Sequence, residues 1–368
     1  MTPLYPLRFK EILRDYRFGE RWIAEVFEKD GLPPEGRIAE TWEVCDRPNE
    51  SSVVTNGPLA GATLHELIAG YGADLLGTEV TRVHGSRFPL LIKLLDVTHP
   101  LGEQVHQSDA LARARGLADP GKTEAWYMLR VKPGATVRCG SQADVDREQV
   151  RAALLNGSIR QLMAEHAVQP GDAFLLHAGT MHFSGGGALF YEIMQNSDVI
   201  IGLRSPALDL PEAQRAAQVE LMLEGIHLEE GFDPQVRPAV LAEGANRRTF
   251  ILAGEHFALE RLDLATPYPL DCTGARFFVL TQIEGFTRVQ ADAGSTELRP
   301  GQSCLLPAVL GRVLLTPQRS SALLKAYLPD LVGDIIQPLR CAGIPDVVIA
   351  GLGGQTRLNP LPGLLHST

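Results

Sequence analysis

Strand-length apolar runs separated by glycine and proline recur from one end of the chain to the other. The 368 residues include 36 glycines and 25 prolines. Between them lie runs such as "FPLLIKLLDV" and "ALFYEIM" in the first half and "RTFILAG" and "SALLKAYL" in the second. Many short strands bounded by turn residues are typical of β-sandwiches and barrels rather than of a doubly wound parallel sheet. The sequence therefore predicts an all-β dominated fold.

Two segments interrupt this pattern with helical spacing. "REQVRAALLNGSIRQLMAEH" has apolar residues at helical intervals and is broken at Gly157. "LPEAQRAAQVELMLEG" places Pro211 in its first turn and ends at Gly225, the asymmetry expected of a helix. We interpret the second helix as the connector between two domains.

An internal repeat divides the chain into two β-rich halves. "PGDAFLLHAGTMH" (170–182) and "PGQSCLLPAVLGR" (300–312) share a Pro-Gly turn, a strand and a further turn. The repeat predicts two copies of one fold. The first copy ends on His182 and the second on Arg312, so the second is expected to keep the shape without a metal ligand. The expected division is an N-terminal domain over 1–205, a helical connector over 206–232, and a C-terminal domain with a tail over 233–368.

Composition narrows the class of protein. The formal charge of −10 disfavours nucleic acid as a partner, and it means that an anionic substrate needs a local positive site. The N-terminal "MTPLYPLRFKEILRDYRFGE" meets charge too early for a signal peptide, and no apolar run approaches the roughly 18 residues of a membrane span. Five scattered cysteines without a CxxC pair indicate neither a disulfide framework nor a thiolate zinc site. We expect a reduced, cytoplasmic protein that contacts no membrane; nothing in the sequence indicates an oligomeric state.

Four polar residues lie in strand-like apolar surroundings, where a packed core would leave their polar groups without partners. Gln104 and His106 are two apart in "EQVHQ" and therefore share a strand face; Glu124 begins "EAWYMLRV", and His182 follows "HAGT". Taken singly, each is more often a structural residue. Together they offer the donor set of a catalytic zinc-type ion with room for water or substrate. With Glu124 ionised and both histidines neutral, such a centre keeps about one positive charge and can stabilise an anionic intermediate.

These motifs resemble the class I mannose-6-phosphate isomerases, which are zinc-dependent enzymes. The strings "IAETWEVCDRPNESSVVTNGPLAGATLHELI", "LGEQVHQSD", "GKTEAWYMLRVKPGA", "LLNGSIRQLMAEHAVQPGDAFLLHAGTMH" and "YEIMQNSD" come in the order of that family. The resemblance covers roughly residues 36–200. Beyond residue 230 it is looser and rests on "HFALERLDL", "GQSCLLPA" and "YLPDL". It implies two tandem cupin (jelly-roll) domains with a few connecting helices.

The resemblance also implies a site and a reaction. It implies one Zn²⁺ per chain, in the N-terminal domain, at the ligand positions Gln104, His106, Glu124 and His182. The sugar pocket would be lined by Lys93 and Lys122, with an acidic pair beyond the second histidine at Glu192 and Asp198. The family reaction interconverts mannose 6-phosphate and fructose 6-phosphate through an enediol(ate). By this resemblance, catalysis is expected from Glu192 and Lys122, and substrate binding from Lys93, Lys122 and Asp198.

Glu192 is the expected base, because a carboxylate near a partly dry metal pocket can have its pKa raised toward neutrality. The alternative is a residue that only supports the metal site or a hairpin. An arginine of the family pattern is missing: the matching region 199–202 ends in Gly202, and the nearest arginine is Arg204. Arg204 is therefore a candidate catalytic replacement, with a solvated charge before a turn as the alternative.

A second departure lies before the first histidine, where Gly102 and Glu103 stand in place of the usual serine and bring a negative charge close to the pocket. Three functions stay open. The first is an isomerase of mannose 6-phosphate. The second is an isomerase of a different, possibly unphosphorylated sugar. The third is a noncatalytic metallocupin that binds a sugar.

Overall fold

Strands arranged in four layers build most of the molecule. The computed structural model describes residues 2–27, 29, 31–202 and 211–367. The six-stranded sheet of the first half has the order β12-β9-β14-β7-β3-β2. Its strands are β2 (Ile12–Arg14), β3 (Glu40–Val44), β7 (Leu90–Val97), β9 (Glu124–Val131), β12 (Ala173–Leu176) and β14 (Ala188–Gln195). It faces a five-stranded sheet made of β8 (Gln104–Val105), β10 (Thr136–Ser141), β11 (Met163–Ala167), β13 (His182–Ser184) and β15 (Ile201–Gly202).

The second half repeats this arrangement. Its large sheet contains the run β23-β20-β25-β18-β17-β16. These strands are β16 (Ala239–Glu243), β17 (Asn246–Ala253), β18 (Ala258–Leu264), β20 (Phe278–Glu284), β23 (Ser303–Leu306) and β25 (Ser321–Tyr327). The facing four-stranded sheet, of order β19-β24-β21-β22, is made of β19 (Tyr268–Cys272), β21 (Thr287–Ala291), β22 (Gly294–Leu298) and β24 (Gly311–Pro317).

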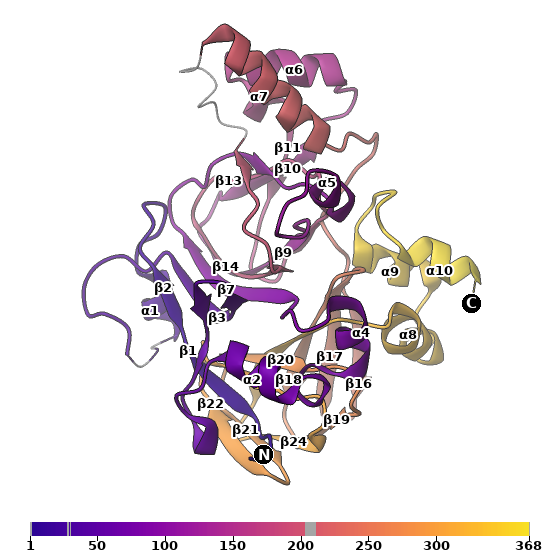
Figure 1. Ribbon diagram of the computed structural model, residues 1–368. Coiled ribbons are helices and arrows are strands. Elements are labelled where there is room, and N and C mark those ends of the chain that lie inside the picture. Colours follow the sequence, from indigo (N-terminus) through magenta and orange to yellow (C-terminus); the bar gives the residue numbers. More distant parts are fainter. Residues whose placement is uncertain (1, 28, 30, 203–210, 368) are drawn as a thin grey trace.

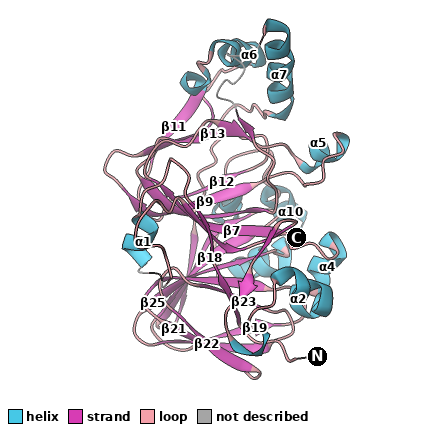
Figure 2. Cartoon of the chain, turned by 60° about the vertical axis from the view of Figure 1, so that its left-hand side comes forward, coloured by secondary structure: helices cyan, strands magenta, loops and turns pink. Residues whose placement is uncertain are grey.

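The two halves therefore share one topology. Strands β7 to β14 of the first sandwich correspond one by one to β18 to β25 of the second. The run β12-β9-β14-β7 thus becomes β23-β20-β25-β18, and β11-β10-β13-β8 becomes β22-β21-β24-β19. The chain is all-β dominated with two tandem jelly rolls, as the sequence predicts. Figures 1 and 2 show the two sandwiches stacked, with their large sheets facing each other.

The strand order crosses the expected boundary between the halves. β1 (Leu7–Lys10) pairs with β23 through Leu7 and Leu305, and β6 (Val53–Val54) pairs with β1. Both lie in the eight-stranded sheet of the second half, so the first 54 residues contribute to both sandwiches. The sequence could not reveal this, because an edge strand supplies the same backbone donors and acceptors to any neighbour. The division at 205 and 232 stays a proposal.

The helices cover the outside of this stack. They are α1 (Trp22–Phe27), α2 (Leu64–Tyr71), α3 (Ala73–Leu76), α4 (Thr78–His84), α5 (Asp109–Ala114), α6 (Arg147–Asn156), α7 (Glu212–Gly225), α8 (Gln337–Cys341), α9 (Asp346–Ala350) and α10 (Leu361–Ser367). The predicted break at Gly157 is confirmed, since this glycine caps α6 with a left-handed φ of 75°. α7 lies within the expected connector and packs against α6 at one end of the molecule (Figure 1). A two-stranded ribbon, β4 (Asp46–Arg47) with β5 (Glu50–Ser51), completes the first half.

Both faces of the two large sheets are covered, which explains the continuous apolar runs in the sequence. On β14, Phe190 belongs to the core inside the first sandwich, whereas Tyr191 and Ile193 belong to the core between the large sheets. On the opposite side of that central core lie Leu305 and Leu324 of the second half. The two sandwiches are therefore joined by a continuous apolar layer.

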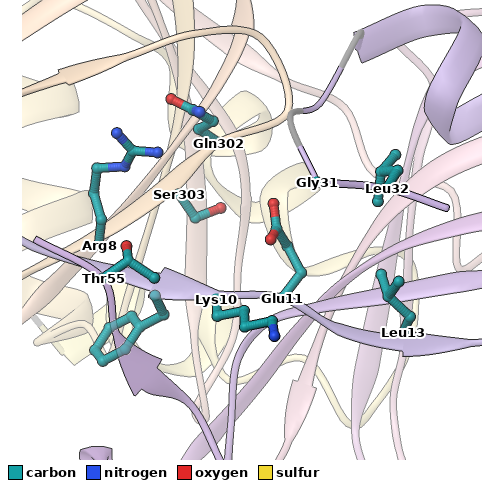
Figure 3. Close-up of a pocket in the computed structure, with 10 residues that line it drawn as sticks. Arg8, Lys10, Glu11, Leu13, Gly31, Leu32, Thr55, Gln302 and Ser303 are labelled. Atoms are coloured by element: carbon teal, nitrogen blue, oxygen red, sulfur yellow. The ribbon is translucent and has the colours of Figure 1, made fainter. Parts of the chain in front are cut away.

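A cavity of about 440 Å³ with a mixed polar and apolar lining lies beside this layer. Its lining includes residues 8–11 of β1 and the turn after it, Leu13 of β2, and Gln302 and Ser303 of the second half. Figure 3 shows the side chains of Arg8, Glu11 and Gln302 around it. In the described part of the chain all five cysteines are free, and no helix is long and apolar enough to cross a bilayer.

Candidate metal centre

Three of the four expected ligands converge inside the first sandwich. His106 follows β8, Glu124 opens β9 and His182 opens β13, and all three are buried. The Nε2 atoms of His106 and His182 each lie 3.2 Å from a different oxygen of Glu124. One donor atom from each residue can be chosen so that all lie within 4.8 Å of one another. Within the described ranges this is the single group of three or more such side chains.

Gln104 is placed beside this group by strand register. His182 of β13 pairs directly with Gln104 of β8, so their side chains share a face. Val105 between them belongs to the apolar core on the other side, as strand alternation requires. The sequence prediction that Gln104 and His106 share a face thus agrees with the pairing.

The unsatisfied atoms in this cluster fit a metal ion. His106 Nδ1 lies 3.0 Å from the Val199 carbonyl, and His182 Nδ1 lies 2.9 Å from the Thr180 carbonyl. A carbonyl only accepts, so each Nδ1 carries the proton and each Nε2 presents a lone pair. Both Nε2 atoms and Oε1 of Glu124 are buried without a hydrogen-bond partner, and Oε2 of Glu124 has only the ion pair with Lys122 at 2.9 Å. Buried polar atoms are seldom left without a partner, and two imidazole nitrogens facing one carboxylate are donors of the kind that a zinc-type cation needs.

Electrostatics keeps these donors in the form that binds metal. Burial, together with Lys122, lowers the pKa of His106 to about 3, so its imidazole is neutral near pH 7. Burial by itself would raise the pKa of Glu124. Lys122, whose Nζ is 2.9 Å from Glu124 Oε2, and the two imidazoles outweigh this effect and hold the pKa well below its ordinary value. Glu124 is therefore ionised.

A second buried polar group surrounds Glu192. The carboxylate lies 3.2 Å from Lys93 Nζ and accepts a 3.1 Å hydrogen bond from Trp126 Nε1. Lys93 Nζ is also 3.4 Å from Glu40, and the ring of Trp126 meets His182 edge-on at 5.5 Å between centroids. Trp126 thus contacts both groups. Burial raises the pKa of Glu192 above its ordinary value, and the nearby charge of Glu124 adds to this.

The acid at 198 lies at the rim. The side chain of Asp198 is 61% exposed and forms an ion pair with Arg47 at 3.1 Å. Arg47 also binds Asp119 at 2.7 Å. The structure therefore does not bring Asp198 into the metal cluster. Arg204 lies outside the described residues.

Two sequence departures acquire a structural meaning. Gly202 pairs with Gln104 across β15 and β8, so the region where the resemblance leads us to expect an arginine lies beside Gln104, an expected ligand. A Cβ added at Gly202 would meet no atom within 4 Å. The extra charge of Glu103 is balanced, because its carboxylate is paired with Arg160 at 2.5 Å.

Sequence reasoning missed the partners that orient the site. The Val199 carbonyl, Trp126 and Glu40 were not singled out, and only the period-two spacing of Glu40 with Trp42 and of Glu124 with Trp126 hinted at them. Arg312, expected to replace His182 in the second copy, is exposed. The inward side chains of β24 are Val313 and Leu315.

Comparison with known proteins agrees with the geometry. Residues 7–125 match the family model of the catalytic domain of type I phosphomannose isomerase, and residues 246–322 match that of the mannose-6-phosphate isomerase cupin domain. A probable mannose-6-phosphate isomerase of Bacillus subtilis (strain 168) is 30% identical over 243 residues, which are 65% of this chain and 75% of the relative. A mannose-6-phosphate isomerase of Streptococcus mutans is 28% identical over 275 residues, 74% and 84% of the two chains.

Solved structures share the fold. The mannose 6-phosphate isomerase of Bacillus subtilis superposes with a TM-score of 0.74 at 23% identity, over 88% of this chain and 99% of the other. A mutant phosphomannose isomerase of Salmonella typhimurium gives a TM-score of 0.71 at 18% identity, over 88% and 100%. Sequence motifs, fold and relatives thus agree: this chain belongs to the type I phosphomannose isomerase family.

Proposed function

We propose that this protein is a metal-dependent aldose–ketose isomerase that interconverts mannose 6-phosphate and fructose 6-phosphate through an enediol(ate). Family membership supports the reaction class. The observation that carries the proposal is the convergence of two imidazole Nε2 atoms on the buried carboxylate of Glu124, next to a separate buried Glu–Lys pair.

The ion is proposed to be one Zn²⁺ per chain, held by Gln104, His106, Glu124 and His182. Bound there, it would supply positive charge that stabilises the oxygens of an enediolate. Elemental analysis is expected to give close to one zinc-like ion per chain, and His106→Ala should lose most of it. Two ions per chain, or retention of the ion in this variant, would contradict the ligand assignment.

The proton is proposed to move through Glu192. A base must take the proton from C2 of the aldose and return it to C1, and a carboxylate with a raised pKa is suited to both steps. Trp126 and Lys93 hold the carboxylate in place from two sides. Lys122, also buried, places its positive charge at Glu124 beside the metal donors. Lys93 and Lys122 would meet the anionic substrate, and Asp198 at the rim would accept from sugar hydroxyls.

A second candidate is an isomerase that acts on an unphosphorylated sugar. It is favoured by Gly202, which stands beside Gln104 where the family pattern has an arginine. Turnover of zinc-loaded protein on a panel of hexoses and hexose phosphates separates the two candidates. Preference for mannose 6-phosphate supports the first, and preference for a neutral sugar supports the second. Turnover of neither would favour a noncatalytic role.

The test of Glu192 is a conservative change. Glu192→Gln keeps the shape and the hydrogen bond from Trp126, and it should lower kcat by about 10²–10⁴-fold while the metal content is unchanged. Glu165→Gln, at a surface carboxylate paired with Arg138, is the matched control and should behave as wild type. A Glu192→Gln variant with normal kcat would exclude Glu192 as the base.

We also propose that the protein works in the cytoplasm, which its free cysteines support.

A further inference from the structure

Three chain segments meet beside Lys122: two carry residues of the metal centre and the third carries Glu192, and two further side chains tie these segments together. One segment follows His106, one leads into Glu124, and the third follows Glu192 at the end of β14. Asp109 lies on the first segment and Gln195 on the third. Both make their hydrogen bonds with the backbone that surrounds Lys122 and with each other.

The first tie runs from Asp109 to the turn before Lys122. The backbone N–H of Gly121 donates to Asp109 Oδ1 at 2.7 Å, and the N–H of Lys122 donates to the Gln107 carbonyl at 3.1 Å. The two backbones are in close contact, because a Cβ at Gly121 would lie 2.4 Å from the backbone nitrogen of Asp109. Only glycine fits there. These two hydrogen bonds therefore fix the position of Lys122 relative to the segment that follows His106.

The second tie runs through Gln195. The N–H of Thr123 donates to Gln195 Oε1 at 2.8 Å, and the backbone N–H of Gln195 donates to the Thr123 carbonyl at 3.0 Å. The side-chain amide of Gln195 then donates to both oxygens of Asp109, at 3.3 Å each. Asp109, Gly121, Thr123 and Gln195 thus form one closed network around Lys122.

An alternative explanation is that Asp109 only stabilises α5, because it lies in the first turn of this helix, where the helix dipole favours negative charge. The contacts argue against this as its main role. Ser108 caps the helix by accepting from the N–H of Leu111. The carboxylate of Asp109 turns instead to Gly121 and Gln195, and neither of these residues is in the helix.

We infer that Asp109 and Gln195 are positioning residues that hold Lys122 and Glu124 in the geometry of the metal centre. Neither contacts a metal donor atom; both line a separate cavity of about 430 Å³ next to His84 and His256. His256 of the second half lies 3.9 Å from Asp109, so this network is also where the second sandwich approaches the catalytic segment. The catalytic consequence rests on the proposed function, whereas the effect on metal binding does not.

The experiment compares Asp109→Ala, Gln195→Ala, the double variant and Asp109→Asn, all prepared as full-length protein. Asp172→Ala is the control, because Asp172 also accepts from a backbone N–H, that of Gln169, in a surface turn away from the site. Three kinds of measurement are made. The first is the affinity for Co²⁺ by chelator competition, together with the absorption spectrum of the bound ion. The others are the steady-state kinetics on mannose 6-phosphate, which give kcat and KM, and the thermal unfolding midpoint.

Each alanine variant should lower Co²⁺ affinity or kcat by about 10–100-fold, the range found for residues that orient metal ligands. The loss should exceed that of Asp172→Ala at equal thermal stability, and the Co²⁺ spectrum should change. The double variant should lose little more than the worse single one, because both residues serve one network. Asp109→Asn keeps Oδ1 for Gly121 and should recover part of the loss.

Wild-type Co²⁺ affinity, spectrum and kcat in both alanine variants would overturn the inference. Losses no larger than that of Asp172→Ala, adding up in the double variant, would overturn it as well. Should Asp109→Ala fail to fold, Gln195→Ala and Asp109→Asn decide by the same criteria. Should wild type fail to turn over mannose 6-phosphate, the proposed function fails, and the Co²⁺ measurements still test the positioning role.

Discussion

At the scale of single residues, hydrogen-bond partners decide what each buried polar group can do. His106 and His182 both donate through Nδ1 to a carbonyl, which leaves Nε2 as the ligand atom. Glu124 and Glu192 are both buried carboxylates, yet their pKa values move in opposite directions because Glu124 is close to Lys122 and two imidazoles. Two acids of the same type thus differ in how readily they take up a proton, which suits them to the different tasks proposed for them.

Gly202→Arg tests whether the missing arginine limits the enzyme. Gly202 is opposite Gln104, and a Cβ added there meets no atom within 4 Å, so the backbone position tolerates a side chain. Guanidinium binds phosphate and enediolate oxygens in a bidentate manner. We expect kcat/KM for mannose 6-phosphate to rise about 10-fold or more, equivalent to about 1.4 kcal/mol of transition-state binding. Gly202→Gln is the uncharged control. A fall or no change in kcat/KM for the arginine variant would show that another cation already fills this role.

The lowered pKa of His106 predicts how the metal-free protein responds to acid. In the unfolded chain this imidazole takes up a proton near pH 6.5, whereas in the folded protein it does so only near pH 3. The unfolded state therefore binds more protons in this window, and folding stability falls as the pH falls from 6.5 toward 3. The contribution is at most about 1.4 kcal/mol per pH unit. Chelator-treated wild type should lose unfolding free energy more steeply between pH 6.5 and 4.5 than His106→Gln does. Equal slopes would contradict the prediction.

At the scale of elements, the two sandwiches place a buried ion pair on equivalent strands with the charges exchanged. Lys93 of β7 is opposite Glu192 of β14 in the first half. The equivalent strands β18 and β25 place Glu260 opposite Lys325. In the second half the pair is sealed by Tyr327, which donates to Glu260, and by Arg248, which binds the same carboxylate through two nitrogens. The same strand register thus serves a proposed catalytic base in one copy and a closed structural network in the other.

Glu260→Gln tests this structural role. Lys325 and Arg248 outweigh the effect of burial and lower the pKa of Glu260 to about 2, so the carboxylate is their counterion. Its removal leaves two cations unpaired, one of them fully buried, and should lower the free energy of unfolding by about 3–5 kcal/mol. Metal content should stay the same, since the metal centre lies in the other sandwich. Glu284→Gln, at an exposed carboxylate paired with Arg261, should cost no more than about 1 kcal/mol. Similar stability losses in the two variants would refute the assignment.

At the scale of the whole molecule, the apolar layer between the two large sheets is what unites the halves. It contains side chains from β7, β9, β12 and β14 on one side and from β1, β18, β20, β23 and β25 on the other. β1 crosses over to pair with β23, so the second half completes its sheet with the N-terminus of the chain. The second sandwich therefore supports the first by covering its large sheet.

A fragment that ends near Gly231 should be poorly soluble, because it exposes the apolar face of the six-stranded sheet and leaves β1 without β23. Co-expression with residues 232–368 is the control and should restore soluble protein that binds metal. The yield of soluble fragment and its metal content check this expectation. A soluble fragment with full activity on its own would show that the second sandwich is dispensable.

The sequence by itself determined the β-rich class, the two-fold repeat and the family, and it named the candidate site residues. These follow from local properties: strand alternation puts Gln104 and His106 on one face, and motifs of specific residue types persist in a family that performs one reaction. Tertiary structure decided the rest. That the Val199 carbonyl orients His106, that Gly202 stands beside Gln104, and that Asp109 holds the turn before Lys122 depends on contacts between segments 12 to 98 residues apart. Such contacts arise from how two sheets and their loops pack, and no local pattern of side chains encodes the distance between them.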